Sequence, residues 1–204
     1  MPVSLVSVVA GDVCSLEEIR QYLQVPGETS DNSLIQDLGR AAVETTQNET
    51  RRKLLTHTLC LWLSAFPVNE IPLPFPPLQE VSEITFVDPD GEVQTVDAAN
   101  FIADKVGEPG CVKLADGVKW PITRAIGTAE HPWPVKIKFK CGYGANSLLI
   151  PATFRTIVKS YIKLWFDVPN PVEMSGSQPA VIPMHAQSLI SLVRDDTQYP
   201  AGTW

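Results

Sequence analysis

The chain has 204 residues, 44% of them hydrophobic and 19% charged, and a formal net charge of −7. This hydrophobic fraction can build a packed core, which argues against wholesale disorder, and the length fits one domain or one domain with a sizeable insertion. Tight general binding of nucleic acid is disfavoured, because it needs clustered Lys and Arg, whereas here the densest basic run is Arg51–Lys53. The composition still allows a surface along which DNA moves without binding tightly.

Cysteine usage and hydropathy indicate a soluble protein made in a cytoplasm. No apolar run approaches the roughly 20 residues that span a bilayer, so no membrane partner is expected. Residues 1–10 are mildly apolar but lack the positively charged start of a signal peptide. The cysteines are widely spaced, which favours reduced thiols in the core over disulfides. They are Cys14, Cys60, Cys111 and Cys141.

Residues 14–55 predict two helices. Ser15 and Glu18 have the spacing of a capping box, and the first helix ends before Pro26-Gly27. A second, long amphipathic helix begins at Asp31 and continues to about Arg52. Its apolar stripe is predicted to contain Leu34, Ile35, Leu38, Ala41, Ala42 and Thr45.

Residues 56–144 predict strands. Apolar and polar residues alternate most clearly over 135–140, where three lysines are expected to face outward. Asp88–Gly91 has the composition of a tight turn that joins two strands into a hairpin. Prolines alternate with apolar residues over 71–76, which places that stretch at a sheet edge or in extended coil. The other strands are expected at 59–63, 81–87, 93–96 and 111–114.

The C-terminal part predicts helices again. Pro151 suits the first position of a helix whose apolar stripe runs from Phe154 to Trp165. Residues 172–183 are rich in proline and small polar residues and are expected to form a loop. A short amphipathic helix follows over 184–193, with Ala186, Leu189, Ile190 and Val193 on one side. In the tail, Tyr199 and Trp204 are expected to be exposed and available to a partner.

The predicted fold class is α+β, in which N- and C-terminal helices form a bundle and a mainly antiparallel β lobe is inserted between them. The expected domains are a helical connector domain at 1–55 and 145–194, the inserted β lobe at 56–144, and a C-terminal tail at 195–204.

No pattern in the sequence supports catalysis, a metal or a cofactor. The three histidines lie far apart and none has a second histidine at i+3 or i+4, with His131 and His185 expected in loops beside prolines. Asp88 and Asp90 lack the remaining ligands of a calcium loop, so the turn interpretation is preferred. No GxSxG, P-loop or GxGxxG motif is present. We therefore expect no catalytic, cofactor-binding or metal-binding residues.

A series of segments, in order along the chain, resembles the head–tail connector (adaptor) proteins of tailed bacteriophages. These segments are Ser15–Leu23, Asp31-Asn32 ahead of Leu34-Ile35, Leu59–Pro67, Ile71–Pro74, Pro76–Leu78, Ile84–Gly91, Lys119–Pro121, and Phe139–Gly144 followed by Pro151. The ordered series covers about residues 15–167, whereas residues 172–204 resemble the family only in a final short helix followed by Arg194. The longer proline-rich linker and the tail depart from the family pattern.

The resemblance implies a structural virion protein at the neck, made in the host cytoplasm and not an enzyme. Such connectors form a ring of identical copies, typically twelve, under the portal protein. The ring joins the DNA-filled head to a stopper, tail-terminator or tail protein and extends the channel through which DNA passes without specific binding. The expected partner interface lies near the C-terminus and comprises Leu189, Val193, Arg194, Tyr199 and Trp204.

Two other functions stay open from the sequence. The β lobe could recognise a protein or carbohydrate outside the virion through a surface aromatic such as Trp120 or Trp133, although packing beside neighbouring prolines is the preferred interpretation. A hydrolase with a thiol nucleophile would need one of the cysteines to lie beside a histidine base.

Overall fold

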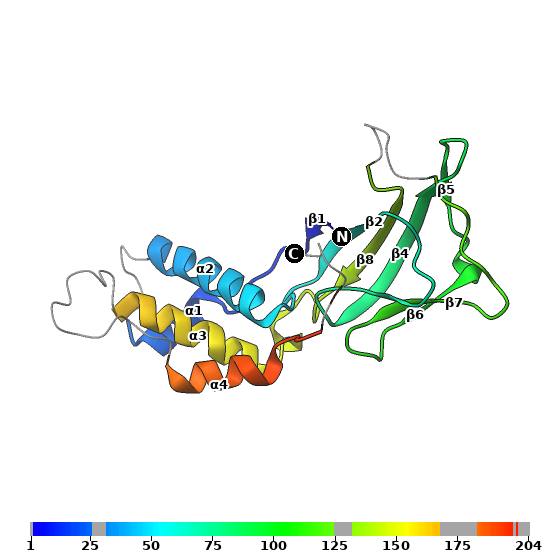
Figure 1. Ribbon diagram of the computed structural model, residues 1–204. Helices are drawn as coiled ribbons and strands as arrows, with labels where there is room; N and C mark the ends of the chain where they lie inside the picture. Colours follow the sequence, from blue (N-terminus) through cyan, green and yellow to red (C-terminus); the bar gives the residue numbers. More distant parts are fainter. Residues whose placement is uncertain (1, 26–31, 125–131, 168–182, 198, 200–204) are drawn as a thin grey trace. The chain divides into compact units, whose positions relative to one another are not determined.

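The computed structural model describes residues 2–25, 32–124, 132–167, 183–197 and 199 (Figure 1). The chain divides into two compact units, which are treated separately. One unit comprises residues 10–54 and 144–194 and is helical, and the other comprises residues 1–9, 55–143 and 195–204 and contains the strands. The α+β class predicted from the sequence is confirmed.

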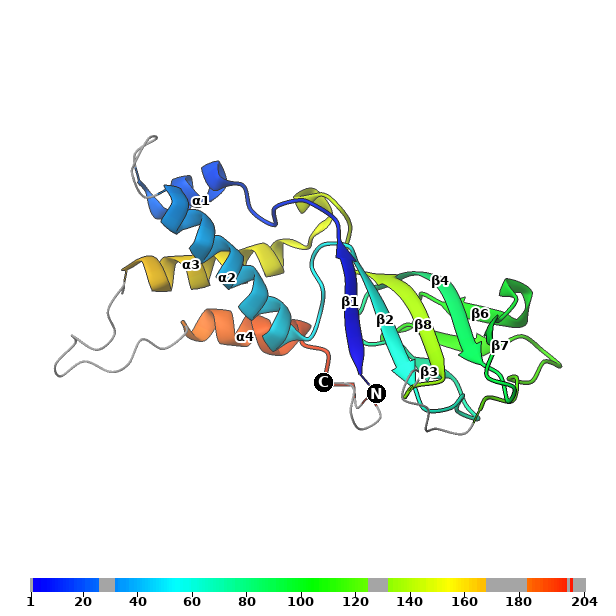
Figure 2. The same cartoon turned by 90° about the horizontal axis from the view of Figure 1, so that it is seen from above.

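The helical unit is formed by segments from both parts of the chain. Its helices are α1 (Leu16–Leu23), α2 (Asn32–Thr50), α3 (Ala152–Asp167) and α4 (Met184–Val193), with a short 3₁₀ turn, η2 (Ser147–Leu149), before α3. Helix α2 packs against the other three helices, and α3 also contacts α1 and α4 (Figure 2). The N- and C-terminal helices therefore pack together, as the sequence predicts.

Helix α1 begins at the predicted capping box. The Ser15 hydroxyl accepts a hydrogen bond from the Glu18 backbone N–H at 3.1 Å, and the Glu18 carboxylate accepts one from the Ser15 N–H at 3.0 Å. These two bonds satisfy backbone donors that the first turn of a helix leaves without partners. The helix then buries Ile19 and Leu23.

The buried face of α2 differs from the predicted stripe. Ile35 and Ala42 are fully buried as predicted, but Leu34 is 52% exposed and Ala41 is also exposed. The core side continues instead through Thr46 and Thr50. Each threonine hydroxyl donates a 2.7 Å hydrogen bond to the carbonyl four residues earlier, so the polar group is satisfied within the helix and can be buried.

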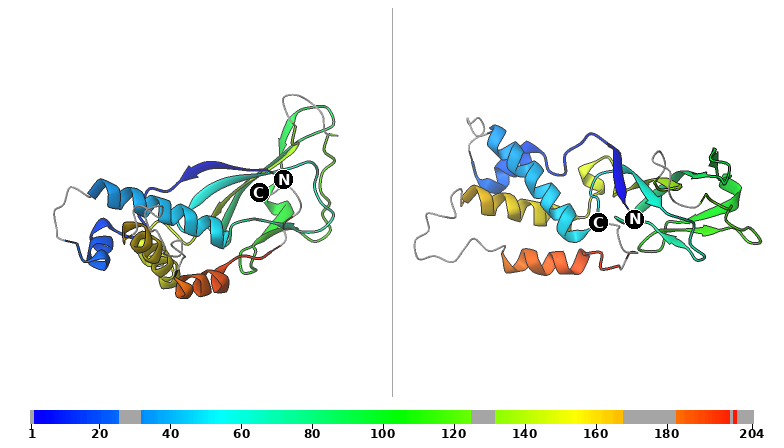
Figure 3. Two further views of the ribbon diagram at one scale, coloured as in Figure 1. Left: turned by 60° about the vertical axis from the view of Figure 1, so that its left-hand side comes forward. Right: turned by 45° about the horizontal axis from the view of Figure 1, so that its top comes forward.

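Helices α3 and α4 have the predicted bounds and bury residues of the predicted inward stripes. Figure 3 shows α3 in yellow and α4 in orange. In α3 the stripe that begins at Phe154 is buried as far as Ile162, and Trp165, partly exposed, lies against the Tyr161 ring with a centroid separation of 5.3 Å. In α4 the buried residues are Ala186 and Ile190.

The other unit contains two antiparallel sheets. The larger has the order β1-β2-β8-β4-β5 and the smaller has the order β3-β7-β6. The strands are β1 (Val3–Val8), β2 (His57–Leu63), β3 (Ile71–Pro72), β4 (Leu78–Val87), β5 (Val93–Thr95), β6 (Phe101–Asp104), β7 (Cys111–Leu114) and β8 (Val135–Cys141). A further 3₁₀ turn, η1 (Ala98–Asn100), precedes β6.

Two strands were absent from the sequence prediction. Residues 1–9 were assigned to the helical domain, but β1 pairs with β2 of the larger sheet, so that assignment was wrong. Strand β6 was also missed, because its four residues form too short a run for a clear alternation. The proline-laced β3 lies at an edge of the smaller sheet, where a residue without an N–H is tolerated, as predicted.

Strand β8 organises the larger sheet from its centre. It pairs with β2 on one side and β4 on the other. Val135, Ile137 and Phe139 are fully buried, and the three intervening lysines lie on the opposite face, as the alternation predicts. The core beneath β8 also contains Leu61 and Ile84 from the flanking strands.

The turn between β4 and β5 forms as predicted. Gly91 has φ +98°, and its N–H donates to the Asp88 carbonyl at 3.0 Å. The Asp88 carboxylate accepts backbone hydrogen bonds from Asp90 and Glu92 at 3.0 and 2.9 Å. Backbone hydrogen bonding, from Glu92 above all, lowers the pKa of Asp88 because it stabilises the charged form.

Gly142, directly after β8, offers a test of the close packing at that end of the sheet. It has φ +111°, and an added Cβ would lie 2.1 Å from the Leu55 carbonyl oxygen. Gly117 is a matched control, because it has φ +77° but nothing within 4 Å of such a Cβ. We expect Gly142→Ala to lower the free energy of unfolding by at least about 2 kcal/mol and Gly117→Ala by about 1 kcal/mol, measured by chemical denaturation. Equal losses would contradict the close approach at Gly142.

Candidate assembly surfaces

The four thiols are poor nucleophiles. All four cysteines are buried and free of disulfides. Burial raises the pKa of Cys14 to about 11 and is also the main cause of the raised pKa values of Cys60 and Cys111. A raised pKa lowers the fraction of thiolate, which is the reactive form.

One histidine lies opposite a cysteine. His57 on β2 is the cross-strand partner of Cys141 on β8, but they are only 7% and 0% exposed. The Nδ1 atom of His57 lies 2.8 Å from the Leu55 carbonyl oxygen. This burial leaves no path by which a substrate could reach the thiol.

The remaining histidines give no support to a catalytic or metal site. His185 was expected in a loop, but it lies in the first turn of α4, where its Nε2 is 3.2 Å from the Ser160 hydroxyl. His131 lies outside the described residues. Within the described part of the chain, no three His, Cys, Asp or Glu side chains gather as metal ligands would. No helix in that part is both long and apolar enough to cross a membrane.

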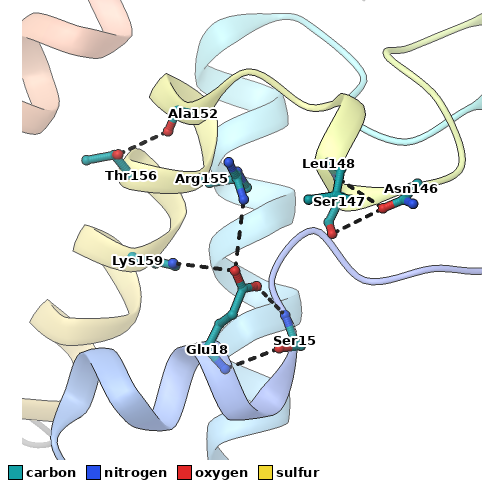
Figure 4. A network of polar contacts seen from close by, with 9 residues as sticks. All are labelled: Ser15, Glu18, Asn146, Ser147, Leu148, Ala152, Arg155, Thr156 and Lys159. Carbon is teal, nitrogen blue, oxygen red and sulfur yellow. Dashed lines mark hydrogen bonds and ion pairs between the residues drawn. The ribbon is translucent and has the colours of Figure 1, made fainter.

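A polar network positions α1 on α3 (Figure 4). The Glu18 carboxylate that caps α1 also lies 3.9 Å from Arg155 Nη1 and 4.0 Å from Lys159 Nζ. These are long ion pairs at a partly exposed site, so each contributes at most about 1 kcal/mol. Their main effect is to fix the orientation of α1.

Two hydrogen bonds connect α2 to the C-terminal helices. The Tyr161 hydroxyl of α3 donates a hydrogen bond to the Glu49 carboxylate at 2.6 Å. The pKa of Tyr161 is raised, mainly because the side chain is buried and secondly because of this hydrogen bond. The Arg52 Nε–H donates to the Val193 carbonyl at 2.7 Å. The last turn of α4 is therefore held to the segment that follows α2.

The predicted interface residues occupy different environments. Leu189 and Val193 are partly buried, Arg194 is exposed, and Trp204 lies outside the described residues. Tyr199 was expected to be exposed, but its side chain is only 9% exposed and its hydroxyl donates to Asp195 at 2.6 Å. That expectation was wrong because Asp195, four residues earlier, is itself buried and provides a charged acceptor.

Sequence reasoning missed the outward side of α4. Met184 is 83% exposed and Leu192 is 79% exposed. The helix contains no charged residue. A helix with apolar residues on both sides is typical of one that becomes buried. The signal was present in the sequence as the lack of any charge over residues 184–193.

The outer face of the larger sheet carries charges of both signs. Lys140 of β8 forms a 2.9 Å ion pair with Glu80 of β4, and Lys136 lies over the Trp62 ring at 5.4 Å from its centroid. Lys138 lies opposite Glu83 in the β4–β8 register. The glutamates of β4 beside the lysine row offset its positive charge, which disfavours phosphate binding on this face.

The two candidate ligand-binding tryptophans differ in exposure. Trp120 packs against the core, with its ring stacked on Phe66 at a centroid separation of 4.5 Å and an interplanar angle of 2°. Trp133 is 36% exposed. Trp120 therefore has the packing role that the sequence analysis preferred. It is not a surface aromatic of the kind that the binding-module alternative requires.

Of the comparisons with known proteins, only the comparison with solved structures finds matches. No family model matches the chain, and no curated protein matches it. Among solved structures, the fold is similar to that of a chain in the neck of an empty gene transfer agent particle computed with C6 symmetry, with a TM-score of 0.76, 20% identity and full coverage of both chains. A chain in the neck of the native particle computed with C12 symmetry matches with a TM-score of 0.74, 20% identity and full coverage of both chains. A chain in the native virion matches with a TM-score of 0.73 and 20% identity over 98% of both chains. The whole fold is thus shared with chains of such particles.

The environment of the thiols predicts their reactivity. At pH 8 we expect Cys14 in the native protein to react with a disulfide reagent about 100-fold more slowly than in denaturant, because a rise of two pKa units lowers its thiolate fraction about that much. Rates followed by absorbance, with and without denaturant, provide the measurement. A thiol that reacts faster in the native protein would revive the hydrolase hypothesis, whereas function kept after replacement of all four cysteines by serine or alanine would dismiss it.

Proposed function

We propose that this chain is a structural neck protein of a phage-like particle, a head–tail connector that works as one copy of a ring. The observation that carries the proposal is the match of the entire fold to chains of gene transfer agent necks, one of them computed with twelvefold symmetry. The ordered sequence resemblance to phage connectors supports the same function independently. In this function the ring, expected to hold twelve copies, lies under the portal in the neck of the virion, and the chain is not an enzyme.

The two units take different roles in this proposal. The helical unit is the connector domain, and the unit with the two sheets is the lobe inserted into it. The lower partner is a stopper, tail-terminator or tail protein. DNA passes through the extended channel without specific binding, and the net charge of −7 together with the balanced charges on the larger sheet suits such a passage.

The C-terminal helix is the proposed docking segment for the portal. Its outward apolar residues, Met184 and Leu192, add to the expected interface at Leu189, Val193 and Arg194. Burying two large apolar side chains would contribute about 1.5 to 3 kcal/mol each. The Arg52 bond to Val193 holds this helix in place before a partner arrives. Tyr199 and Trp204 remain in the proposal as residues of the tail that follows.

The direct test is to mix the purified chain with the portal of the same particle and to measure the mass and symmetry of the product. We expect a closed ring of this chain on the portal by native mass spectrometry and electron microscopy. A chain that stays monomeric beside the portal, together with particles whose neck lacks this polypeptide, would contradict the proposed function.

Substitution on α4 tests the docking segment. We expect Leu192→Glu to reduce head–tail joining at least tenfold, since it places a charge in an apolar contact, while the melting temperature changes little because Leu192 is exposed. Gln187→Glu adds the same charge at another exposed position of α4 and is the control. Head–tail joining is measured as infectious or transducing particles in a complementation assay. Normal joining by Leu192→Glu, or by a chain that ends after Arg194, would contradict docking through this segment.

A further inference from the structure

Among the described residues, the two edge strands of the larger sheet each pair on one side only. Its order places β1 at one edge and β5 at the other. All three residues of β5 and five of the six residues of β1 are exposed. Leu5 is 61% exposed and Val93 is 59% exposed, so apolar side chains as well as backbone reach the solvent at both edges.

These edges lack the usual protection against pairing with another chain. Exposed edge strands in natural proteins typically carry charged residues, especially lysine. Here β1 and β5 contain no charged residue, whereas the interior strands β4 and β8 contain Glu80, Glu83 and three lysines. The charge pattern is therefore the reverse of the protective one.

The register shows which backbone groups point away from the sheet. The Trp62 N–H donates to the Pro2 carbonyl, so Val3 and Leu5 direct their own N–H and C=O groups outward from β1. The Val96 N–H donates to the Ile84 carbonyl, so Val93 and Thr95 do the same from β5. Within the described residues, no hydrogen bond is recorded to these outward groups.

The side-chain faces then fix the direction in which the two edges can pair. All four strand pairs of the sheet are antiparallel, so β1 and β5 run in the same direction. Val3 and Leu5 lie on the core face with Leu61 and Leu59, whereas Thr95 lies on the outer face with Thr85 and Lys136. Two copies that keep the same face outward can therefore join β1 to β5 only as parallel strands.

We propose that β1 of one copy pairs in parallel with β5 of the next copy, so that the larger sheets continue around the ring. This inference rests on the proposed function, because a closed ring needs two different surfaces on opposite sides of each copy, and the edges of one sheet meet that need. The bulge between Leu5 and Ser7 limits the regular part of β1 to the residues before it, which matches the three residues of β5. In a parallel pairing that places side chains of the same sheet face opposite one another, Gln94 lies opposite Val3 or Leu5.

Cysteine cross-linking tests the pairing in the full-length chain. Parallel neighbours lie about 4.8 Å apart, within the Cα separation that a disulfide accepts. We expect Gln94→Cys combined with Leu5→Cys or with Val3→Cys to give, after mild oxidation of assembled rings, a ladder of covalent multimers in steps of 22.4 kDa on a non-reducing gel. Mixing the two single variants should stop at the dimer, because each copy then has only one new thiol. The native thiols are buried and do not compete.

Leu5→Cys with Thr95→Cys is the matched control, since Thr95 is next to Gln94 but lies on the opposite face, with Thr85. We expect no ladder from it. Circular dichroism of each variant before oxidation verifies folding, and the exposed Leu5 and Gln94 sites tolerate substitution best. Rings on the portal that give no ladder, or give it equally with the Thr95 control, would overturn the edge pairing and leave the proposed function intact. Absence of rings altogether would overturn both.

Discussion

The pairing of β8 with both β2 and β4 is the constraint on which the larger sheet depends. The side chains of β8 alternate, so Val135, Ile137 and Phe139 can be fully buried only if this strand keeps one register with both neighbours. A shift by one residue would bury lysines in the core. That register also sets where the lysine row meets the glutamates of β4 and which backbone groups of β1 and β5 face outward. The proposed contact between copies is thus a consequence of packing at the centre of the sheet.

In the helical unit, polar side chains form hydrogen bonds or ion pairs with nearby residues. The Glu18 carboxylate both caps α1 and lies near two cations of α3, and the hydroxyls of Thr46 and Thr50 are satisfied by their own helix. On α4, by contrast, two large apolar side chains, Met184 and Leu192, are exposed among polar residues of the same helix. Such a combination of a self-sufficient fold and exposed apolar residues suits the proposed role as a connector, which reaches its final environment only in an assembly.

The sequence predicted those elements whose pattern depends on burial or on local chemistry. The alternation of β8, the Asp88–Gly91 turn and the Ser15–Glu18 capping box were all correct, since each is determined by neighbours in the chain. Strand β1 was missed because its apolar–polar alternation is interrupted at the bulge between Leu5 and Ser7 and none of its six residues is fully buried. The exposure of Leu34 was mispredicted because composition does not reveal that threonines can replace apolar residues on the buried side of a helix. The candidate interface on α4 was predicted only in part, because the sequence analysis considered the apolar stripe that faces the core and did not consider Met184 and Leu192 on other sides of the helix.

The burial of the four cysteines has a consequence for durability. In oxidising surroundings, oxygen and peroxides convert accessible thiolates to sulfenic acid and mixed disulfides. Solvent exposures of 7% or less at Cys14, Cys60, Cys111 and Cys141 keep these side chains away from such oxidants. The core of this chain therefore resists thiol oxidation for as long as the protein stays folded.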